Sequence, residues 1–264
     1  MNEAKSHLDA GRLNDAVQSA LNTVKSHPSD IPARTFLFEL SCFSGDWERA
    51  EKQIDVIGHQ DSKAMMSSMI YRQSFKAERD RMKFFSDGEK PAAPMPPPDY
   101  VEDLLRANEL IREAKTAEAR QMLDQVDTNR PAFPCTVNGE EFGNFRDYND
   151  STMCVFEVII KDLYVWLPFE QVKTINFLER KSLRDVFWPH AEVEMTNGTN
   201  GEMFVPSLYA NSWRNEDDQV RLGRTVDWRN AGDDIYIGEG SKLFTMDGTD
   251  KSILDIKTIE FKHS

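Results

Sequence analysis

The sequence has no long apolar run and few cysteines, and it lacks an excess of basic charge. No stretch approaches the ~18 consecutive apolar residues of a membrane-spanning helix. The polar N-terminus also lacks the apolar core of a signal peptide. The three cysteines, Cys42, Cys135 and Cys154, lie in unrelated settings, which fits a reducing compartment and not a disulfide framework. We therefore expect a cytoplasmic protein without a membrane segment.

The shortage of basic residues excludes a second class of partner. Lys and Arg number 32 against 45 Asp and Glu, which gives 264 residues a formal net charge of -13. Binding to a nucleic-acid backbone or to an anionic membrane requires clustered Lys and Arg. We therefore expect neither nucleic acid nor membrane among the partners. With 39% hydrophobic residues, the chain is long enough for one large or two medium domains.

Recognisable catalytic motifs are also missing. The sequence has no nucleophile elbow, paired CxxC or HExxH motif. His190, Glu192 and Glu194 alternate along an expected strand and would present three metal ligands on one face, although an amphipathic strand with a solvated side explains the same pattern. We therefore predict no catalytic residue, no metal site and no cofactor. A metal-dependent hydrolase built on these three residues is the alternative.

A helix-turn-helix unit recurs in the first half of the chain. The unit at residues 31–61 carries Gly45 between its helices, and a shift of 34 residues places Gly11 at the matching position upstream. A later unit carries Ala114 there. The residues after these turns on the inward face also match, as do two closing prolines: Ala16, Ala50 and Ala119; Ala20, Ile54 and Leu123; Pro28 and Pro131. A period of 34 residues is typical of tetratricopeptide repeats.

Two further segments complete the first half. Residues 62–85 predict a longer helix with a methionine-rich stretch at 65–70, which is either core or partner-facing. Residues 86–98 contain a run of prolines that cannot be helical, so we expect a stiff connector, with a proline-rich ligand for an SH3-like groove as the alternative. We assign residues 1–131 to a helical repeat domain with this linker at 86–98.

After Pro131 the hydrophobic period changes from that of helices to that of strands. Strands are expected at 152–160, 163–167, 172–178, 190–195, 202–205, 225–229, 234–237, 242–245, 253–256 and 258–261. Short strands with tight turns favour a small barrel or a strongly bent antiparallel sheet. The predicted fold class is therefore α+β and multidomain, with residues 132–264 as the β-rich domain.

Several segments of the second half resemble one family. They are FGNFRD at 142–147, YVWLPFE at 164–170, LRDVFW at 183–188, FVPSLY at 204–209, RLGRTVDW at 221–228 and LDIKTIEF at 254–261. Together they are similar to the ImpE family, also called SciE-type or TagJ, whose members also begin with helical repeats. Phe169 departs from the family's usual tryptophan. Within the 221–228 segment, we expect Arg224 and Asp227 to pair and to hold Trp228, with contact to a partner as the alternative.

The resemblance implies a cytoplasmic, non-enzymatic accessory protein of a bacterial type VI secretion system. It implies binding to a helix of the small contractile-sheath subunit and a link to recycling by a ClpV-type unfoldase. It implies no catalytic residues. A general peptide-binding scaffold or chaperone outside secretion remains an alternative for the repeats.

Stacked helical hairpins build a concave face that accepts an amphipathic helix. By resemblance to tetratricopeptide units, that face includes residues from the first helix of the second hairpin and matching positions of the last hairpin. These candidate partner-binding residues are Thr35, Glu39 and Cys42, and Val101, Leu104, Asn108 and Ile111. Core packing between hairpins is the alternative explanation for their apolar spacing.

Overall fold

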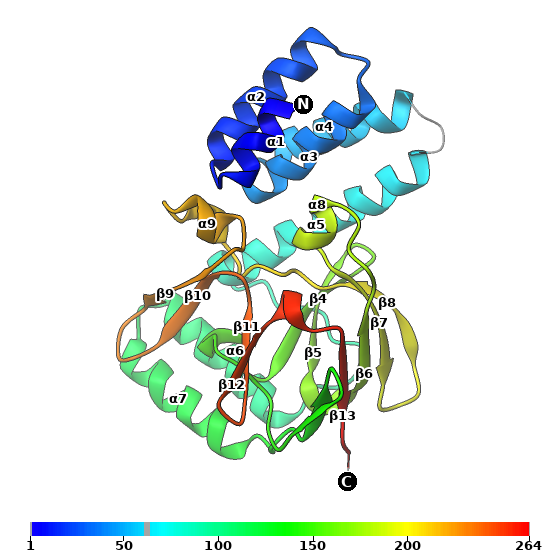
Figure 1. The fold of residues 1–264 in the computed structure, drawn as a ribbon. Helices are drawn as coiled ribbons and strands as arrows, with labels where there is room; N and C mark the ends of the chain where they lie inside the picture. Colours follow the sequence, from blue (N-terminus) through cyan, green and yellow to red (C-terminus); the bar gives the residue numbers. More distant parts are fainter. Residues whose placement is uncertain (1, 61–63, 264) are drawn as a thin grey trace.

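The computed structural model describes residues 2–60 and 64–263 and begins with five helices that pack in chain order (Figure 1). They are α1 (Asn2–Asp9), α2 (Leu13–Ser26), α3 (Ile31–Phe43), α4 (Trp47–Gln60) and α5 (Met65–Asp87). A further pair, α6 (Asp99–Arg112) and α7 (Thr116–Asn129), comes after the proline-rich segment. Helices thus occupy all three expected hairpins, whereas their assignment to the tetratricopeptide class stays a prediction. The first two residues of the helix expected at 62–85, Ser62 and Lys63, lie outside the described residues.

Local sequence explains where these helices begin and turn. Gly11 and Gly45 come after α1 and α3 with φ of 73° and 70°, a left-handed conformation that glycine adopts without a Cβ penalty. The Asp30 side chain accepts a hydrogen bond from the Ala33 N–H at 2.9 Å and caps the start of α3. Ala16 and Ala50 are fully buried on α2 and α4, where neighbouring helices leave no room for longer side chains.

The β-rich part contains one large sheet and two small ones. Its strands are β1 (Cys135–Val137), β2 (Glu140–Phe142), β3 (Arg146–Asp147), β4 (Val155–Ile160), β5 (Leu163–Pro168), β6 (Val172–Phe177), β7 (His190–Met195), β8 (Asn200–Phe204), β9 (Val226–Asn230), β10 (Tyr236–Gly240), β11 (Leu243–Met246), β12 (Thr249–Ser252) and β13 (Thr258–Phe261). The short helices between them are η1 (Asp150–Thr152), η2 (Phe169–Gln171), α8 (Leu183–Phe187), η3 (Ser212–Arg214), α9 (Asp218–Arg221) and η4 (Ile253–Asp255).

The large sheet is antiparallel and open. Its strand order is β2-β1-β13-β6-β7-β8-β4-β5, so β2 and β5 are edge strands that do not pair with each other in the part of the chain described. The predicted mixed α+β class with an antiparallel sheet is confirmed, but the closed barrel offered as one form of it is wrong. Pairing between β1 and β13 joins distant segments, and no local sequence pattern specifies such an order.

Some strands differ from expectation for local reasons. The segment at 253–256 is not the expected strand but contains η4, because the Ser252 side chain accepts a hydrogen bond from the Leu254 N–H. The short strands β1, β2 and β12 carry too few alternating apolar residues to be recognised. The tight turns are as expected: Lys161 lies in the β4–β5 turn and Asp247 in the β11–β12 turn, both with positive φ.

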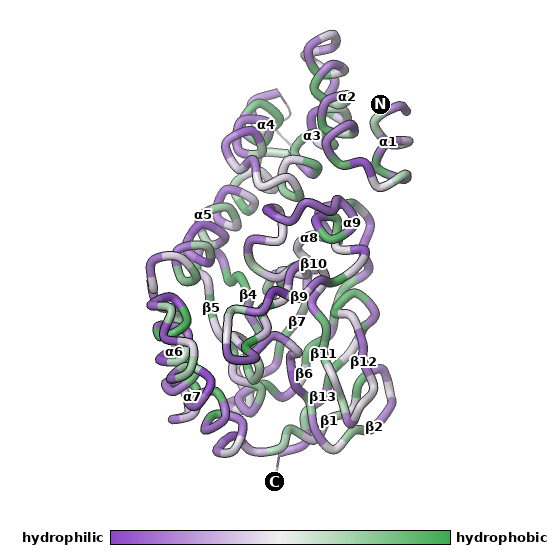
Figure 2. Tube along the Cα trace, turned by 90° about the vertical axis from the view of Figure 1, so that its left-hand side faces the viewer, coloured by the Kyte–Doolittle hydropathy of each residue, from purple (hydrophilic) through white to green (hydrophobic). Residues whose placement is uncertain are grey.

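The helices α6 and α7 pack on the sheet. Val101, Leu104 and Leu123 belong to the same hydrophobic cluster as Phe156 and Ile259 of the sheet. Figure 2 shows this helix pair along one side of the β-rich body, opposite β11 and β12. The cluster of α1–α4 is a separate one. The expected division of the chain at residue 131 stays a prediction, and the third hairpin shares its core with the strands of the β-rich part.

The proline-rich segment lies on the edge of the sheet. The Ala92 N–H donates to the Tyr164 carbonyl at 2.9 Å, and the Trp166 N–H donates to the Ala92 carbonyl at 3.0 Å. The Gln171 side chain also donates to the Pro96 carbonyl at 2.7 Å. The two Ala92 hydrogen bonds cover backbone groups of the edge strand β5, which would otherwise be open to another strand. In the described residues, no helix is both long and apolar enough to cross a membrane.

Candidate interaction surfaces

The predicted binding face of α3 is covered by α8. Glu39 and Cys42 are buried, whereas Thr35 is half-buried and donates to the Ile31 carbonyl. Arg184 of α8 lies 3.8 Å from the Glu39 carboxylate, and Phe187 packs edge-on against Phe43 with ring centres 5.0 Å apart. A short helix of the β-rich part therefore occupies the place expected for a partner helix.

The four matching residues of α6 belong mostly to the core. Val101 and Leu104 are buried beneath the sheet, and Asn108 donates to the Ser151 carbonyl at 3.0 Å. Ile111 is half-buried and packs against the edge of the same cluster. Cys42 belongs to one hydrophobic cluster and Val101 and Leu104 to another, so the structure does not bring the seven predicted residues together as one surface.

An exposed methionine stripe lies at the start of α5. We define the methionine stripe as Met65, Met66, Met69 and Ile70, whose exposures range from 41% to 71%. The inward side of this stretch carries Ser68, which packs close to Gly58 of α4. The methionine stripe thus places apolar side chains on the outward side, where a surface helix usually carries polar ones. Sequence spacing leaves this stretch open between core and partner contact, and the structure places it on the surface.

The signature segment at 221–228 binds the first helices. Arg224 donates to the carbonyls of Leu8 at 2.6 Å and Asp9 at 3.2 Å, at the C-terminal end of α1. The expected pairing of Arg224 with Asp227 is therefore wrong. Arg224 instead satisfies the last carbonyls of a helix, which attract cations. Trp228 packs against Tyr148 and Tyr209.

The turns of all three helical hairpins contact the segment between 211 and 235. The Leu13 N–H donates to Asp218 at 2.7 Å, next to the Gly11 turn. A Cβ at Gly45 would lie 2.4 Å from the Trp213 ring. Beyond Ala114, the Thr116 hydroxyl donates to Asp233 at 2.5 Å. The matching repeat positions therefore serve as contact points for one segment of the β-rich part.

A buried charge cluster joins α5 to the sheet. The Arg81 guanidinium donates to both Glu157 oxygens at 2.9 and 3.1 Å, and to Glu78 at 2.8 Å. Lys242 lies 2.8 Å from Glu157. Burial opposes ionisation of Glu157, but the two cations outweigh it and hold the pKa of that carboxyl well below its usual range.

This charge cluster is not reachable by a substrate. The cavity beside Glu78 and Arg81 measures about 10 Å³, room for about one water. Burial, opposed by Lys242, raises the pKa of nearby Asp147 to about 6. Burial also raises the pKa of Cys135 and of Cys154 to about 12, so neither is an activated thiol. We infer that the buried charge cluster around Arg81 holds α5 on the sheet.

Two of the three residues considered as metal ligands contact other side chains. His190 contacts Glu202 at 3.1 Å, and Glu194 contacts Lys173 at 2.7 Å. Across residues 2–60 and 64–263, no group of three or more His, Cys, Asp or Glu side chains is arranged to hold a metal ion. The pattern is that of a strand with one solvated face.

Comparisons with known proteins agree on one family. A family model described as "ImpE protein" matches residues 139–260. One relative is the type VI secretion system accessory component TagJ of Pseudomonas aeruginosa, which is 30% identical over 259 residues, covering 98% of this chain and 91% of the relative. A crystal structure of a protein from Vibrio parahaemolyticus has a TM-score of 0.90 at 23% identity, covering 99% of this chain and 98% of that one. The last likeness shows a shared fold.

Proposed function

Because the chain belongs to the ImpE family, we propose that it is a cytoplasmic, non-enzymatic accessory protein of a bacterial type VI secretion system. In this proposal it is an adaptor that binds a helix of the small contractile-sheath subunit and links the sheath to recycling by a ClpV-type unfoldase. The likeness to the P. aeruginosa accessory component supports the secretion role. The sheath helix and the unfoldase are what the family resemblance implies.

The observation that carries the adaptor proposal is the methionine stripe. Its four side chains lie on adjacent turns of one helix, exposed on the side away from Ser68. Methionine is flexible and polarisable, so methionine-rich surfaces adapt to the apolar face of a partner helix. Contiguous apolar exposure of this kind marks interaction surfaces in soluble proteins. We propose that the sheath helix lies along this stripe.

The predicted face of α3 is not the binding site in this proposal. Because α8 already covers Glu39 and Cys42, a partner would reach them only after α8 had left. Val101 and Leu104 would require the opening of the main core. Of the seven residues predicted from sequence, only Thr35 and Ile111 are partly exposed. In this proposal the methionine stripe therefore provides most of the energy for binding the sheath helix.

A pull-down with the small sheath subunit tests the proposal. We expect the full-length subunit to be retained, and a version lacking its terminal helices to be lost. The double variant Met66→Glu/Met69→Glu should reduce retention at least about tenfold, because it places two charges in an apolar contact. The matched control is Leu178→Glu, which changes another exposed apolar side chain outside the stripe and should bind normally.

Three outcomes would contradict the proposal. Retention of neither subunit version removes the sheath as partner. Equal loss in the stripe variant and in Leu178→Glu would show that the stripe has no special role. Equal retention of unrelated amphipathic helices would favour the general scaffold.

A further inference from the structure

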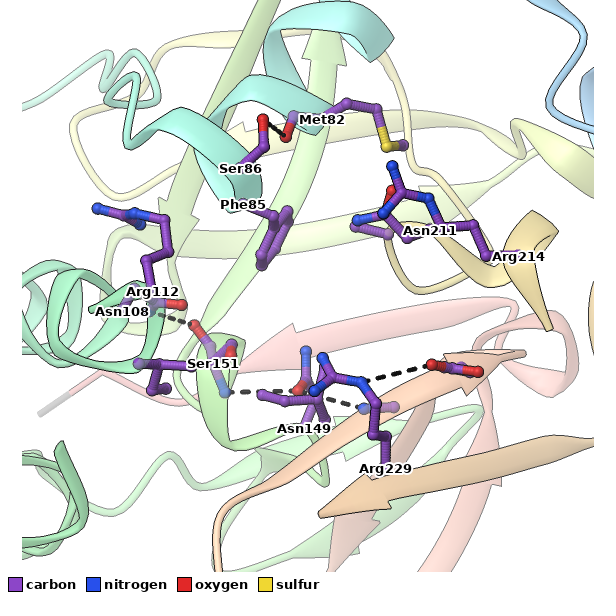
Figure 3. Close-up of a pocket in the computed structure, with 15 residues that line it drawn as sticks. Met82, Phe85, Ser86, Asn108, Arg112, Asn149, Ser151, Asn211, Arg214 and Arg229 are labelled. Carbon is purple, nitrogen blue, oxygen red and sulfur yellow. Dashed lines mark hydrogen bonds and ion pairs between the residues drawn. The ribbon is translucent and has the colours of Figure 1, made fainter. Parts of the chain in front are cut away.

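A cleft of about 340 Å³ opens at the other end of α5 (Figure 3). It lies between the C-terminal ends of α5 and α6, the segment around η1, the loop at 210–214 and strands β9 and β10. Its apolar lining includes Met82, Phe85, Ile111 and Ile237. This volume is at the small end of the range for ligand pockets, so the cleft suits a small ligand or a few side chains and not a folded element.

Three arginines line the cleft, and they differ in how they are engaged. Arg112 donates to the Phe84 carbonyl at 3.1 Å, and Arg229 lies 3.6 Å from Glu239. Arg214 is the arginine whose guanidinium has neither a hydrogen bond nor an ion pair within residues 2–60 and 64–263; it lies over the Trp213 ring at 4.9 Å. Figure 3 shows Arg214 in the right-hand part of the view and Arg229 below the centre, on two sides of the cleft.

The cleft lining holds three arginines and one carboxylate, although the protein as a whole is acidic. Carboxylates outnumber Lys and Arg by 45 to 32, yet none lies within ion-pair distance of Arg214 in the described chain. The one carboxylate in the lining, Glu239, is engaged by Arg229 and by the Asn215 amide at 2.8 Å. A guanidinium left open beside an apolar surface is suited to a carboxylate, which it can bind through two hydrogen bonds.

We propose that this cleft binds the carboxylate of a short acidic and hydrophobic peptide segment. The carboxylate contacts Arg214 and Arg229, and a neighbouring apolar side chain covers Phe85 and Ile111. The lining does not favour a nucleotide, because it has no glycine-rich phosphate loop, and the Gly238 N–H already donates to Asn149 at 3.4 Å. The site is independent of the methionine stripe, which lies roughly 20 Å or more away along α5 at about 1.5 Å per residue.

A titration of the full chain with two model peptides tests this site. The probe is acetyl-Leu-Glu-Leu-amide, the matched control is acetyl-Leu-Gln-Leu-amide, and the readout is the Nε–Hε resonances of the arginines in a ¹⁵N-labelled sample. We expect saturable shifts at Arg214 and Arg229 with the Glu peptide. Binding of the Gln peptide should be about tenfold weaker, because a charge-assisted hydrogen bond is lost.

Variants assign the binding to the cleft. Arg214→Gln and Arg229→Gln change exposed side chains and should each weaken binding of the Glu peptide about tenfold. Arg106→Gln, on α6 but outside the cleft, should leave it unchanged. Equal affinity for the two peptides, no shift at either arginine, or shifts with ATP in place of the Glu peptide would each overturn the proposal.

Discussion

Glu157 is the carboxylate on which the buried charge cluster depends. Its loss would leave Lys242 without its acidic partner and Arg81 with Glu78 alone. Removing one member of a buried ion pair costs about 3–5 kcal/mol, because a charge stays buried without compensation. We predict that Glu157→Gln lowers the free energy of unfolding by about that amount, measured by urea unfolding at pH 7.

The matched control for this prediction is a solvent-accessible ion pair between α4 and α5. Glu51→Gln breaks the contact between Glu51 and Arg79 and should cost less than about 1 kcal/mol. Similar small losses in the two variants would show that the buried cluster does not stabilise the fold.

Glu39 should make the stability depend on pH near neutrality. Burial raises the pKa of Glu39 from 4.5 to about 7, against the opposing effect of Arg184. Between these two values the folded protein holds a proton that the unfolded chain has released. The stabilisation from Glu39 is therefore complete below pH 4.5 and is lost as the pH rises through 7.

Thermal unfolding at two pH values tests this effect. Glu39→Gln should be more stable than the wild type at pH 8 by about 1–3 kcal/mol, and the difference should vanish near pH 4.5. Glu48→Gln, an exposed carboxylate on α4, should not alter the pH dependence. A wild type whose stability relative to Glu39→Gln is the same at both pH values would contradict the assigned burial.

At the scale of elements, α9 holds the first two helices in place. Asp218 caps the start of α2 through the Leu13 N–H, across more than two hundred residues of sequence. Loss of a cap costs about 1 kcal/mol, equivalent to about a fivefold change in local opening. We predict that Asp218→Ala raises hydrogen exchange in α1 and α2 about fivefold, measured by mass spectrometry. Asp227→Ala, outside this contact, should leave α1 and α2 protected; equal effects of the two variants would contradict the role of α9.

Elements that depend on local sequence were predictable. Glycine in the left-handed conformation set the turns at Gly11 and Gly45, and strand β7 has the expected bounds. The covering of α3 by α8 was not predictable, because Phe43 and Phe187 meet only through the tertiary fold. The exposure of the methionine stripe was not predictable for the same reason. Its apolar residues fit a buried helix equally well until the neighbouring helices are placed.

At the scale of the whole molecule, several contacts make the helices and the sheet one unit. The segment at 211–235 contacts three hairpin turns, the cluster around Arg81 fixes α5 on β4, and Ala92 lies on β5. The two proposed binding regions lie near opposite ends of α5. The length of α5 therefore separates the methionine stripe from the cleft proposed to bind a carboxylate.

Methyl NMR of the methionines, during titration with the small sheath subunit, tests the adaptor role most directly. We predict that the methyl resonances of Met65, Met66 and Met69 shift or broaden. Met153 and Met246, which are fully buried, serve as internal controls and should stay unchanged. Binding that leaves the three stripe methyls unmoved, or no change in any methyl at saturating subunit, would contradict the adaptor role.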